Sequence, residues 1–442
     1  MSLRTFARGI HPPDQKAQTR DLAITPLPPG KTVVIPLLQH TGAPATPLVQ
    51  KGQRVRLGEK IGEPKGLISA AVHASVSGTV VAIEPRPTPA GNAVPVVVIE
   101  NDGSDERFPH AALKAPADLT PEEVVAAVRE AGIVGMGGAA FPTAVKLTPP
   151  AEHPVDTVVV NGAECEPWLT CDTRLMRERI DQVIAAADVV MRTVRARKVW
   201  FGIEANKPEV LDLLAGKLAG RSDMAVAALK TKYPQGGEKM LIDAILKRRV
   251  PSGGLPFHVG VLVQNVGTLY AIWQALEQGQ PLVERVVTVA GDAIAAPGNR
   301  SVRIGTSFQE VLAACDAQPG EGLALLMGGP MMGVAQWRTD LPVVKATSGL
   351  LLTHRSGSET RETHCIRCNR CVSHCPMRLI PSRLAQLTRS GDFTAAREWG
   401  LLDCMECGSC AYVCPAGIPL VQWVRLGKAE VLRSKRSMEK KP

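Results

Sequence analysis

Near its carboxyl end the chain reads Cys365-Ile-Arg-Cys368-Asn-Arg-Cys371-Val-Ser-His-Cys375-Pro376, and the same spacing recurs in Cys404-Met-Glu-Cys407-Gly-Ser-Cys410-Ala-Tyr-Val-Cys414-Pro415. Each run follows the pattern C-x₂-C-x₂-C-x₃-C-P, which is typical of a loop that holds a [4Fe–4S] cluster. Two-residue gaps let three thiolates converge from one tight turn onto neighbouring iron atoms. The fourth cysteine, followed by proline, points away, and in two-cluster ferredoxins it ligates the other cluster.

The two motifs therefore predict two [4Fe–4S] clusters that exchange their fourth ligands. Structural zinc is the alternative, because tetrahedral Zn²⁺ also takes four cysteines. Zinc ligands usually come as C-x₂-C pairs separated by longer spacers, without a third close cysteine. Three cysteines outside the motifs, Cys165, Cys171 and Cys315, are interpreted as packing residues. The predicted ligands are Cys365, Cys368, Cys371 and Cys414 for one cluster, and Cys404, Cys407, Cys410 and Cys375 for the other.

Composition narrows the class of protein. A chain of 442 residues with 45% hydrophobic content is long enough for about three folded domains. No apolar run reaches the roughly 18 residues of a membrane-spanning helix, and no export signal follows the first arginines. Clusters in a chain that is not exported indicate the reducing cytoplasm. The net charge of +9 would suit nucleic acid, but an aromatic content of 4% leaves few stacking platforms, so no nucleic-acid partner is expected.

The first segment, residues 1–112, is rich in short strand-like runs such as Lys31–Ile35 and Pro95–Ile99. Its pattern resembles the barrel-sandwich hybrid of lipoyl and biotinyl carrier domains. The turn that carries their modified lysine is absent, so we expect a docking or packing module without a prosthetic group.

The second segment, residues 118–278, alternates helix and strand patterns. Thr120 as N-cap, followed by Pro121 and two glutamates, predicts a helix that ends near Glu130. A glycine-rich loop follows, Gly135-Met-Gly137-Gly138-Ala-Ala-Phe141-Pro-Thr-Ala-Val-Lys146. Glycines let backbone amides approach a phosphate closely, and a lysine can neutralise it. An ordinary tight turn remains the alternative for this loop alone.

Polar residues follow two predicted buried strands of this segment. Asn161 and the acidic Glu164 and Glu166 come after Val158–Val160, and Asn265 and Thr268 come after Val259–Val263. Ligands of α/β proteins bind at the carboxyl ends of such strands. A second glycine turn, Gly236-Gly237-Glu238, opens a helix between them.

In order and spacing, these motifs resemble the NADH-binding flavoprotein of respiratory complex I. With the barrel-sandwich pattern before them and two cluster motifs behind, the whole chain resembles the family of the C subunit of the Rnf (Rsx) electron-transport complex. The resemblance implies FMN on the glycine-rich loop and NADH stacked on its ring. Three positions depart from the complex I pattern: Met136 replaces an arginine, Ala140 a glycine and Ala163 an aspartate.

The resemblance also implies residue roles. Gly135, Gly137, Gly138 and Lys146 would hold the FMN phosphate and ring edge, with Asn161, Asn265 and Thr268 beneath them. Phe141, Glu166 and Glu238 would face the dinucleotide, and Glu164, Gly236 and Gly237 complete the predicted cofactor-binding set. For Glu166 the alternative is a strand-end carboxylate satisfied by backbone amides. No acid–base pair is required, and no catalytic residue is assigned.

The predicted fold class is therefore multidomain α/β. Residues 283–335 resemble the small β-grasp (SLBB-type) domain that follows the flavin domain in these proteins, and residues 358–430 form an α-helical ferredoxin with both clusters.

The predicted function is electron transfer between NAD(H) and ferredoxin-type carriers, in a membrane complex that translocates ions. We expect a peripheral protein at the cytoplasmic side of the bacterial inner membrane, with an iron–sulfur subunit among its partners. Three alternatives stay open: a cobalamin reductase-like protein, in which the barrel-sandwich comes after the flavin domain, a relay or assembly subunit without flavin, and a zinc-bearing nucleic-acid binder.

Overall fold

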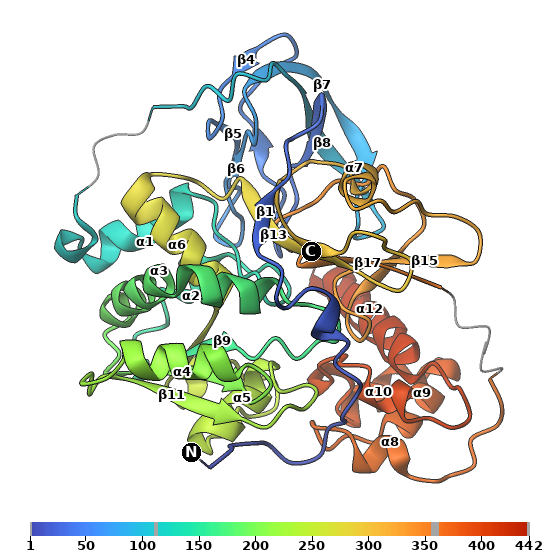
Figure 1. The fold of residues 1–442 in the computed structure, drawn as a ribbon. Helices are drawn as coiled ribbons and strands as arrows, with labels where there is room; N and C mark the ends of the chain where they lie inside the picture. The colour runs from blue at the N-terminus through green and yellow to red at the C-terminus, as the bar shows by residue number, and fades with distance from the viewer. Residues whose placement is uncertain (1, 110–113, 355–361, 440–442) are drawn as a thin grey trace.

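The computed structural model of the chain describes residues 2–109, 114–354 and 362–439, and Figure 1 shows their arrangement. The predicted domain limits at residues 112 and 358 lie outside the described residues. No helix in these three ranges is long and apolar enough to cross a membrane.

The N-terminal strands build two small sheets around an apolar core, at the top of Figure 1. Strand β2 pairs antiparallel with β8, so the two strands predicted for this segment lie side by side. Val33 and Ile35 face the core because residues two apart in a strand share one face. The first sheet has the order β2 (Thr32–Pro36), β8 (Ala93–Asn101), β7 (Gly78–Pro87) and β4 (Arg54–Val55), and the second β3 (Thr46–Pro47), β5 (Lys60–Glu63) and β6 (Val72–His73).

A four-stranded parallel sheet of order β11-β10-β9-β12 organises the second segment. Val158 and Val160 of β9 pack into the core beneath α3 and α6, and Val159 packs into the core beneath α5. Helices thus cover both faces, which explains the unbroken apolar run predicted as a buried strand. The strands are β9 (Thr157–Gly162), β10 (Lys198–Glu204), β11 (Met224–Leu229) and β12 (Val261–Asn265). The helices are α1 (Pro121–Glu130), α2 (Thr143–Lys146), α3 (Cys171–Thr193), α4 (Pro208–Lys217), α5 (Glu238–Leu246), α6 (Val266–Gln278) and the 3₁₀ turn η3 (Pro256–Val259).

Helix α1 confirms the predicted start and end. The Thr120 side chain accepts the Glu123 amide, and the Glu123 carboxylate accepts the Thr120 amide in return. This capping box satisfies amides that a helix leaves unpaired at its first turn.

A mixed six-stranded sheet joins segments that are far apart in the sequence. Its order is β1-β14-β13-β17-β15-β16, and α7 packs against it with Ser307 as N-cap. Strands β1 and β17 lie outside the predicted range 283–335, so the third domain draws on more of the chain than that range. The elements are β1 (Ile24–Pro26), β13 (Glu284–Ala290), β14 (Gly298–Arg303), α7 (Phe308–Ala313), β15 (Leu323–Met327), β16 (Val334–Gln336) and β17 (Gly349–His354).

Four short helices and the longer α12 form the described part of the C-terminal region, at the lower right of Figure 1. Leu384, Leu387, Leu401 and Val424 make its small apolar core. The dark blue N-terminal segment runs along the parallel-sheet domain to these helices before it turns back toward β1. The helices are α8 (Arg370–Ser373), α9 (Pro381–Arg389), α10 (Phe393–Glu398), α11 (Ser409–Tyr412) and α12 (Leu420–Glu439), with a 3₁₀ turn η4 (Leu401–Asp403).

Candidate functional site

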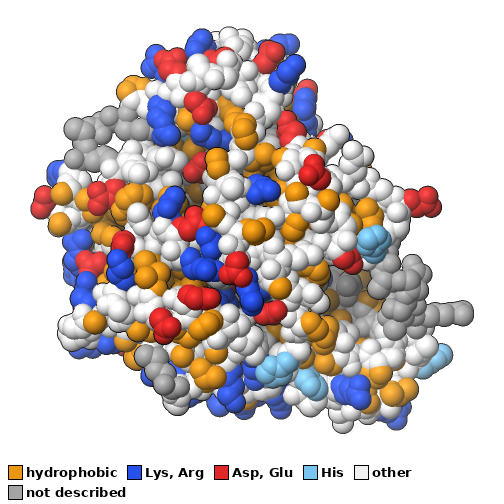
Figure 2. Space-filling view, viewed as in Figure 1, with side chains coloured by type: hydrophobic (Ala, Val, Ile, Leu, Met, Phe, Trp, Pro, Cys, Tyr) orange, Lys and Arg blue, Asp and Glu red, His pale blue; other side chains and the backbone are white. Residues whose placement is uncertain are grey.

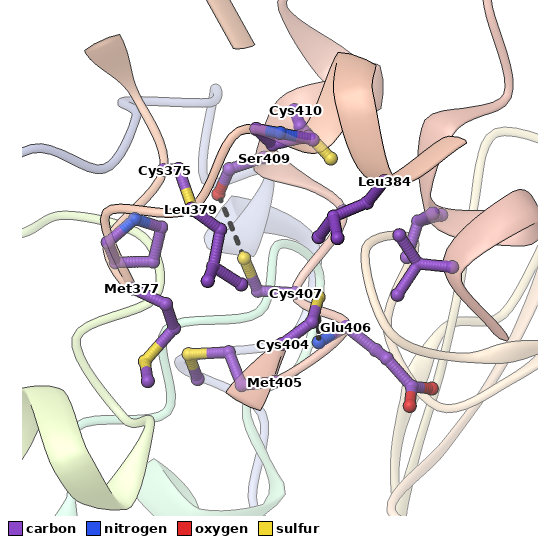
Figure 3. A pocket seen from close by; sticks show the side chains of 15 residues that line it. Cys375, Met377, Leu379, Leu384, Cys404, Met405, Glu406, Cys407, Ser409 and Cys410 are labelled. Atoms are coloured by element: carbon purple, nitrogen blue, oxygen red, sulfur yellow. Dashed lines mark hydrogen bonds between the residues drawn. The ribbon is translucent and has the colours of Figure 1, made fainter. Parts of the chain in front are cut away.

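Four cysteines from both motifs line one cavity in the C-terminal region. Cys404, Cys407 and Cys410 come from the second motif, and Cys375 comes from the first (Figure 3). The other lining side chains are mainly apolar, including Leu384 at the centre of Figure 3. The structure therefore brings together the ligand set that the sequence predicts for one cluster, across the two motifs. Individual ligand roles stay a prediction that this arrangement supports.

Left-handed backbone turns recur at equivalent places in the two motifs. Arg367 (φ 57°) and Glu406 (φ 59°) precede the second cysteine of each motif, and Asn369 (φ 59°) and Gly408 (φ 76°) follow it. A left-handed residue beside a right-handed one turns successive amides toward the same side, which makes a concave site for negative charge. The Glu406 amide accordingly donates to Cys404 Sγ at 3.3 Å. The repetition indicates two equivalent anion-binding loops, as a pair of thiolate clusters requires.

Burial makes free thiolates unfavourable in the cavity. It raises the pKa of Cys404 to about 11 and also raises the pKa values of Cys375, Cys407 and Cys410. A coordinating metal reverses this preference, since a metal-bound thiol is deprotonated. The donor set of four thiols, with amide and Ser409 hydroxyl groups beside the sulfurs, fits a [4Fe–4S] cluster.

The other predicted ligand set lies closer to the surface. Cys365 and Cys368 are exposed, while Cys371 and Cys414 are half-buried. Cys371 and Cys414 pack against the apolar group that contains Cys410. The two cysteine sets are therefore neighbours, one enclosed and one open to solvent.

The carboxyl ends of β9 and β12 form the second part of the site. Strands β10 and β11 lie on one side of β9, and β12 lies on its other side. The chain segments that leave the carboxyl ends of β9 and β12 therefore run in different directions. Such a divergence leaves a crevice in which α/β proteins bind ligands. Asn161 and Asn265, both predicted from the sequence, are register partners at this point.

Each asparagine is fixed by neighbouring protein groups. Asn161 donates to the Gly236 carbonyl at 2.8 Å, which ties the second glycine turn to the end of β9. Asn265 accepts the Gly267 amide as N-cap of α6 and donates to Asp172 at 2.6 Å. Burial and the neighbouring Glu164 raise the pKa of Asp172 to about 6.

The glycine-rich loop lies over the N-terminus of α6. The Met136 amide donates to the buried Thr268 hydroxyl at 3.0 Å, and the Gly135 amide donates to the Phe141 carbonyl at 2.8 Å. A Cβ atom on Gly137 would lie 3.0 Å from the Asn265 side chain, whereas one on Gly138 would meet nothing within 4 Å. The loop therefore needs glycine at 137 to reach Asn265, and at 138 it faces open space.

Lys146 and Glu238 meet at the same edge of the sheet. The Lys146 ammonium donates to Glu238 at 2.7 Å and to the Val263 carbonyl at 2.7 Å. Two side chains predicted for different ligands, FMN and the dinucleotide, thus form one ion pair. Because Glu238 is 45% exposed, the pair is open to solvent.

Two other predicted residues bind protein groups. Glu164 accepts the Asp172 and Thr173 amides and so caps α3. Glu166 is half-buried and accepts the amides of Met331 and Met332 at 3.0 and 2.9 Å. Glu166 thus has the arrangement of the alternative interpretation, a carboxylate satisfied by backbone amides. Its proposed contact with a dinucleotide remains untested.

The crevice fits a flavin nucleotide. Residues 137–139 are exposed, the loop offers backbone amides, and Lys146 supplies a positive charge. Gln235, next to Gly236, is fully buried, and neither atom of its amide has a partner among the described residues. These features are what a polar, phosphorylated ligand would satisfy.

The crevice and the cysteine cavity are in direct contact, and two of the contact residues, Met405 and Tyr233, were not singled out by the sequence. Gly237 lies so close to Met405, the residue after the ligand Cys404, that a Cβ atom at 237 would overlap the Met405 methyl group. The Tyr233 hydroxyl donates to the Cys407 carbonyl at 2.7 Å. Cys165, interpreted as a packing residue, accepts the Gly236 amide at 3.2 Å between them. No sequence pattern marks such contacts, because Tyr233 and Cys407 are separated by 174 positions.

Three family models match the chain. They are the RnfC barrel sandwich hybrid domain over residues 4–104, the Nuo51 FMN-binding domain over residues 128–274, and the 4Fe-4S dicluster domain over residues 364–418. The predicted fold class is confirmed, as is the predicted cofactor complement of FMN and two [4Fe–4S] clusters. The dicluster match also favours iron–sulfur clusters over zinc.

Similar proteins cover nearly the whole chain. The C subunit of the proton-translocating ferredoxin:NAD(+) oxidoreductase complex of Clostridium ljungdahlii is 44% identical, over 97% of this chain and 94% of its own length. The Na(+)-translocating counterpart of Acetobacterium woodii is also 44% identical, over 98% of each chain. The chain belongs to this RnfC family. The C subunit of the ion-translocating oxidoreductase complex of Rhodobacter capsulatus is a third member, 40% identical over 96% of this chain and 82% of its own.

A solved structure shares the fold of this RnfC-family chain at low sequence identity. An NAD+-reducing [NiFe]-hydrogenase in the air-oxidized state superposes with a TM-score of 0.51 and 19% identity, over 71% of this chain and 64% of that chain. This likeness concerns the fold alone.

Proposed function

We propose that the chain is the FMN- and cluster-bearing subunit that exchanges electrons with NAD(H) in an ion-translocating ferredoxin:NAD(+) oxidoreductase complex. The names of its relatives support the reaction class and the assembly with other subunits. Its place is the cytoplasmic side of the bacterial inner membrane, as a peripheral protein. The observation that carries the proposal is the contact between the Gly237 turn of the crevice and Met405 of the cysteine cavity.

FMN bound in the crevice would supply the conversion between the two-electron hydride of NADH and the single electrons that iron–sulfur clusters accept. The protein binds and orients the reactants. Asn161 and Asn265 hold the floor of the crevice, Thr268 fixes the glycine-rich loop above it, and Lys146 compensates the negative charge of a phosphate. The Lys146–Glu238 pair separates when a ligand takes over the ammonium group.

The positions of the two cysteine sets support an order of electron transfer between them. The cavity of Cys404, Cys407, Cys410 and Cys375 abuts the crevice through Met405 and Tyr233. The set of Cys365, Cys368, Cys371 and Cys414 lies beyond it, toward the surface. We assign the first set to the cluster nearer the flavin and the second to the cluster nearer the partner. The ranges 1–112, 118–278, 283–335 and 358–430 are proposed as the four modules of the chain, with β1 and β17 added to the sheet of the third.

Anaerobic purification with quantitation of flavin, iron and acid-labile sulfide tests this function. We expect one FMN and two clusters per chain, and we expect NADH to bleach first the flavin and then the cluster absorption. Flavin that stays oxidised in the presence of NADH contradicts the dinucleotide assignment. A preparation that holds clusters but binds no FMN when titrated favours a flavin-free relay instead.

A further inference from the structure

The ligand loop of the outer cluster lies at the molecular surface. All residues from 362 to 370 are exposed, including the two ligands Cys365 and Cys368. The inner set differs, because Cys375, Cys407 and Cys410 are buried. An electron can therefore reach an external partner most directly through the outer set.

Apolar side chains border this exposed loop. Ile366, between the two exposed ligands, is 68% exposed, and Tyr412, at the end of α11, is 53% exposed. Helix α11, which ends at Tyr412, packs against α8, which follows the loop and carries the ligand Cys371. Tyrosine is among the residues enriched at protein–protein interfaces.

The same surface carries uncompensated positive charge. Arg367 and Arg370 are exposed and have no carboxylate within 4 Å among the described residues. Arg8 from the N-terminal segment adds a third exposed guanidinium, which donates to the Val372 carbonyl of α8. Basic and histidine side chains are visible around hydrophobic ones at the lower right of Figure 2, over α8 to α10.

Two described acidic residues of this region already have basic partners. Glu362 pairs with Arg389 at 2.6 Å. Glu406 pairs with Arg425 at 3.1 Å and with Lys428 at 2.8 Å. Within the part of the chain that the structure describes, the two arginines of the loop therefore have no acidic partner, and their charge complements that of an acidic protein.

We propose that this surface, which we name the port and define by Cys365, Ile366, Arg367, Cys368, Arg370 and Tyr412, docks an acidic ferredoxin-type iron–sulfur protein. That electrons leave or enter the protein at the port rests on the proposed function. One electron passes between the outer cluster and the partner's cluster, so that one centre is oxidised and the other reduced. No bond forms or breaks and no proton moves. An anionic membrane would match the charge, but it offers no redox centre to the exposed ligands.

Binding of the full, cluster-loaded chain to an oxidised acidic two-[4Fe–4S] ferredoxin tests the port. The variant Arg367→Glu/Arg370→Glu reverses two charges at the port. The matched control, Lys51→Glu/Lys65→Glu, reverses two exposed lysines of the N-terminal domain, which lies at the opposite end of Figure 1. Calorimetric titration gives Kd at low and high ionic strength, and iron content shows whether each variant keeps its clusters.

We expect the port variant to bind ferredoxin roughly 10- to 100-fold more weakly at low salt, because charge complementarity speeds encounter and stabilises the complex. The control should bind as the unmodified chain does. Wild-type affinity should itself fall as salt rises, and this measurement, which needs no variant, can still contradict the proposal if the port variant loses iron.

Salt-independent binding by the wild type, or equal weakening in the control, overturns the proposal. So does a port variant that loses binding to anionic lipid vesicles while ferredoxin binding stays unchanged. The titration requires no NADH. A protein that binds ferredoxin at the port but is not reduced by NADH would therefore contradict the proposed function and leave the port intact.

Discussion

Replacing Cys375 tests how the two cysteine motifs share their clusters. Cys375 belongs to the first motif in sequence, but its side chain lines the cavity of Cys404, Cys407 and Cys410. None of Cys365, Cys368, Cys371 and Cys414 lines that cavity. We therefore expect Cys375→Ala to destroy the cluster of the second motif and to spare the cluster of its own motif.

The magnitude follows from the ligand count. Two [4Fe–4S] clusters bring about eight irons per chain, and loss of the inner one leaves about four. The helical region should stay folded, since its apolar core of Leu384, Leu387 and Val424 lies on α9 and α12 and needs no cysteine. Iron and sulfide analysis measures the loss, and electron paramagnetic resonance of the reduced protein identifies the cluster that remains.

Two reference variants make the identification unambiguous. Cys404→Ala removes a ligand of the inner set, and Cys365→Ala removes a ligand of the outer set. The spectrum of Cys375→Ala should match that of Cys404→Ala. A spectrum that matches Cys365→Ala instead would mean that each motif holds its own cluster, and the assigned exchange of fourth ligands would be wrong.

Three further changes probe the crevice and its supports. Gly137→Ala should lower both FMN content and the melting temperature of the apoprotein, because its Cβ would lie 3.0 Å from Asn265; Gly138→Ala, which meets nothing within 4 Å, should leave that temperature unchanged. Thr41→Val removes a 2.7 Å hydrogen bond from the N-terminal domain to the Ala139 carbonyl of the glycine-rich loop, and a loss of about 1 kcal/mol should weaken FMN binding about fivefold in a fluorescence titration. Burial lowers the pKa of Lys345 to about 7, so the unfolded chain binds more protons above that pH, and stability should rise by about 2.5 kcal/mol from pH 7 to pH 9. The Lys345→Met variant lacks this titration, so its melting temperature, measured by calorimetry, should depend less steeply on pH than that of the wild type. An equally steep dependence would contradict the lowered pKa of Lys345.

Local patterns in the sequence were enough to predict much of the fold. The α1 capping box, the buried strand at Val158–Val160 and the cluster loops each depend on residues within about ten positions of one another. Spacing alone also indicated that Cys375 would join the second motif. The helix cap and the buried strand are confirmed, because caps and strand patterns are decided by short-range chemistry, whereas the exchange of fourth ligands stays a prediction.

The contacts that connect the parts of the site could not be predicted from local sequence patterns. The six-stranded sheet includes β1 and β17 from outside the predicted β-grasp range. They join it through backbone pairing, which leaves no pattern of side chains in the sequence. Glu166 follows a strand end like a ligand residue, yet it binds two amides of a turn 165 and 166 positions away. Carboxylates at strand ends have the same sequence appearance in both roles, so only the position of the partner distinguishes them.

Electron transfer between the crevice and the cysteine cavity requires a fixed separation, and the backbone provides it. Interfaces between domains are by default mobile unless they are large and apolar. Here Ile10 and Tyr233 exchange two backbone hydrogen bonds of 2.9 Å, and the Gly9 amide donates to the His374 carbonyl at 3.1 Å. The N-terminal segment thus ties the turn that carries Tyr233 to the residue before the ligand Cys375. These bonds use main-chain atoms, so they tolerate most side chains of the segment. Gly9 is an exception, because it is left-handed and a Cβ there would lie 2.6 Å from the Tyr233 carbonyl, and the Arg8 side chain adds a hydrogen bond to the Val372 carbonyl.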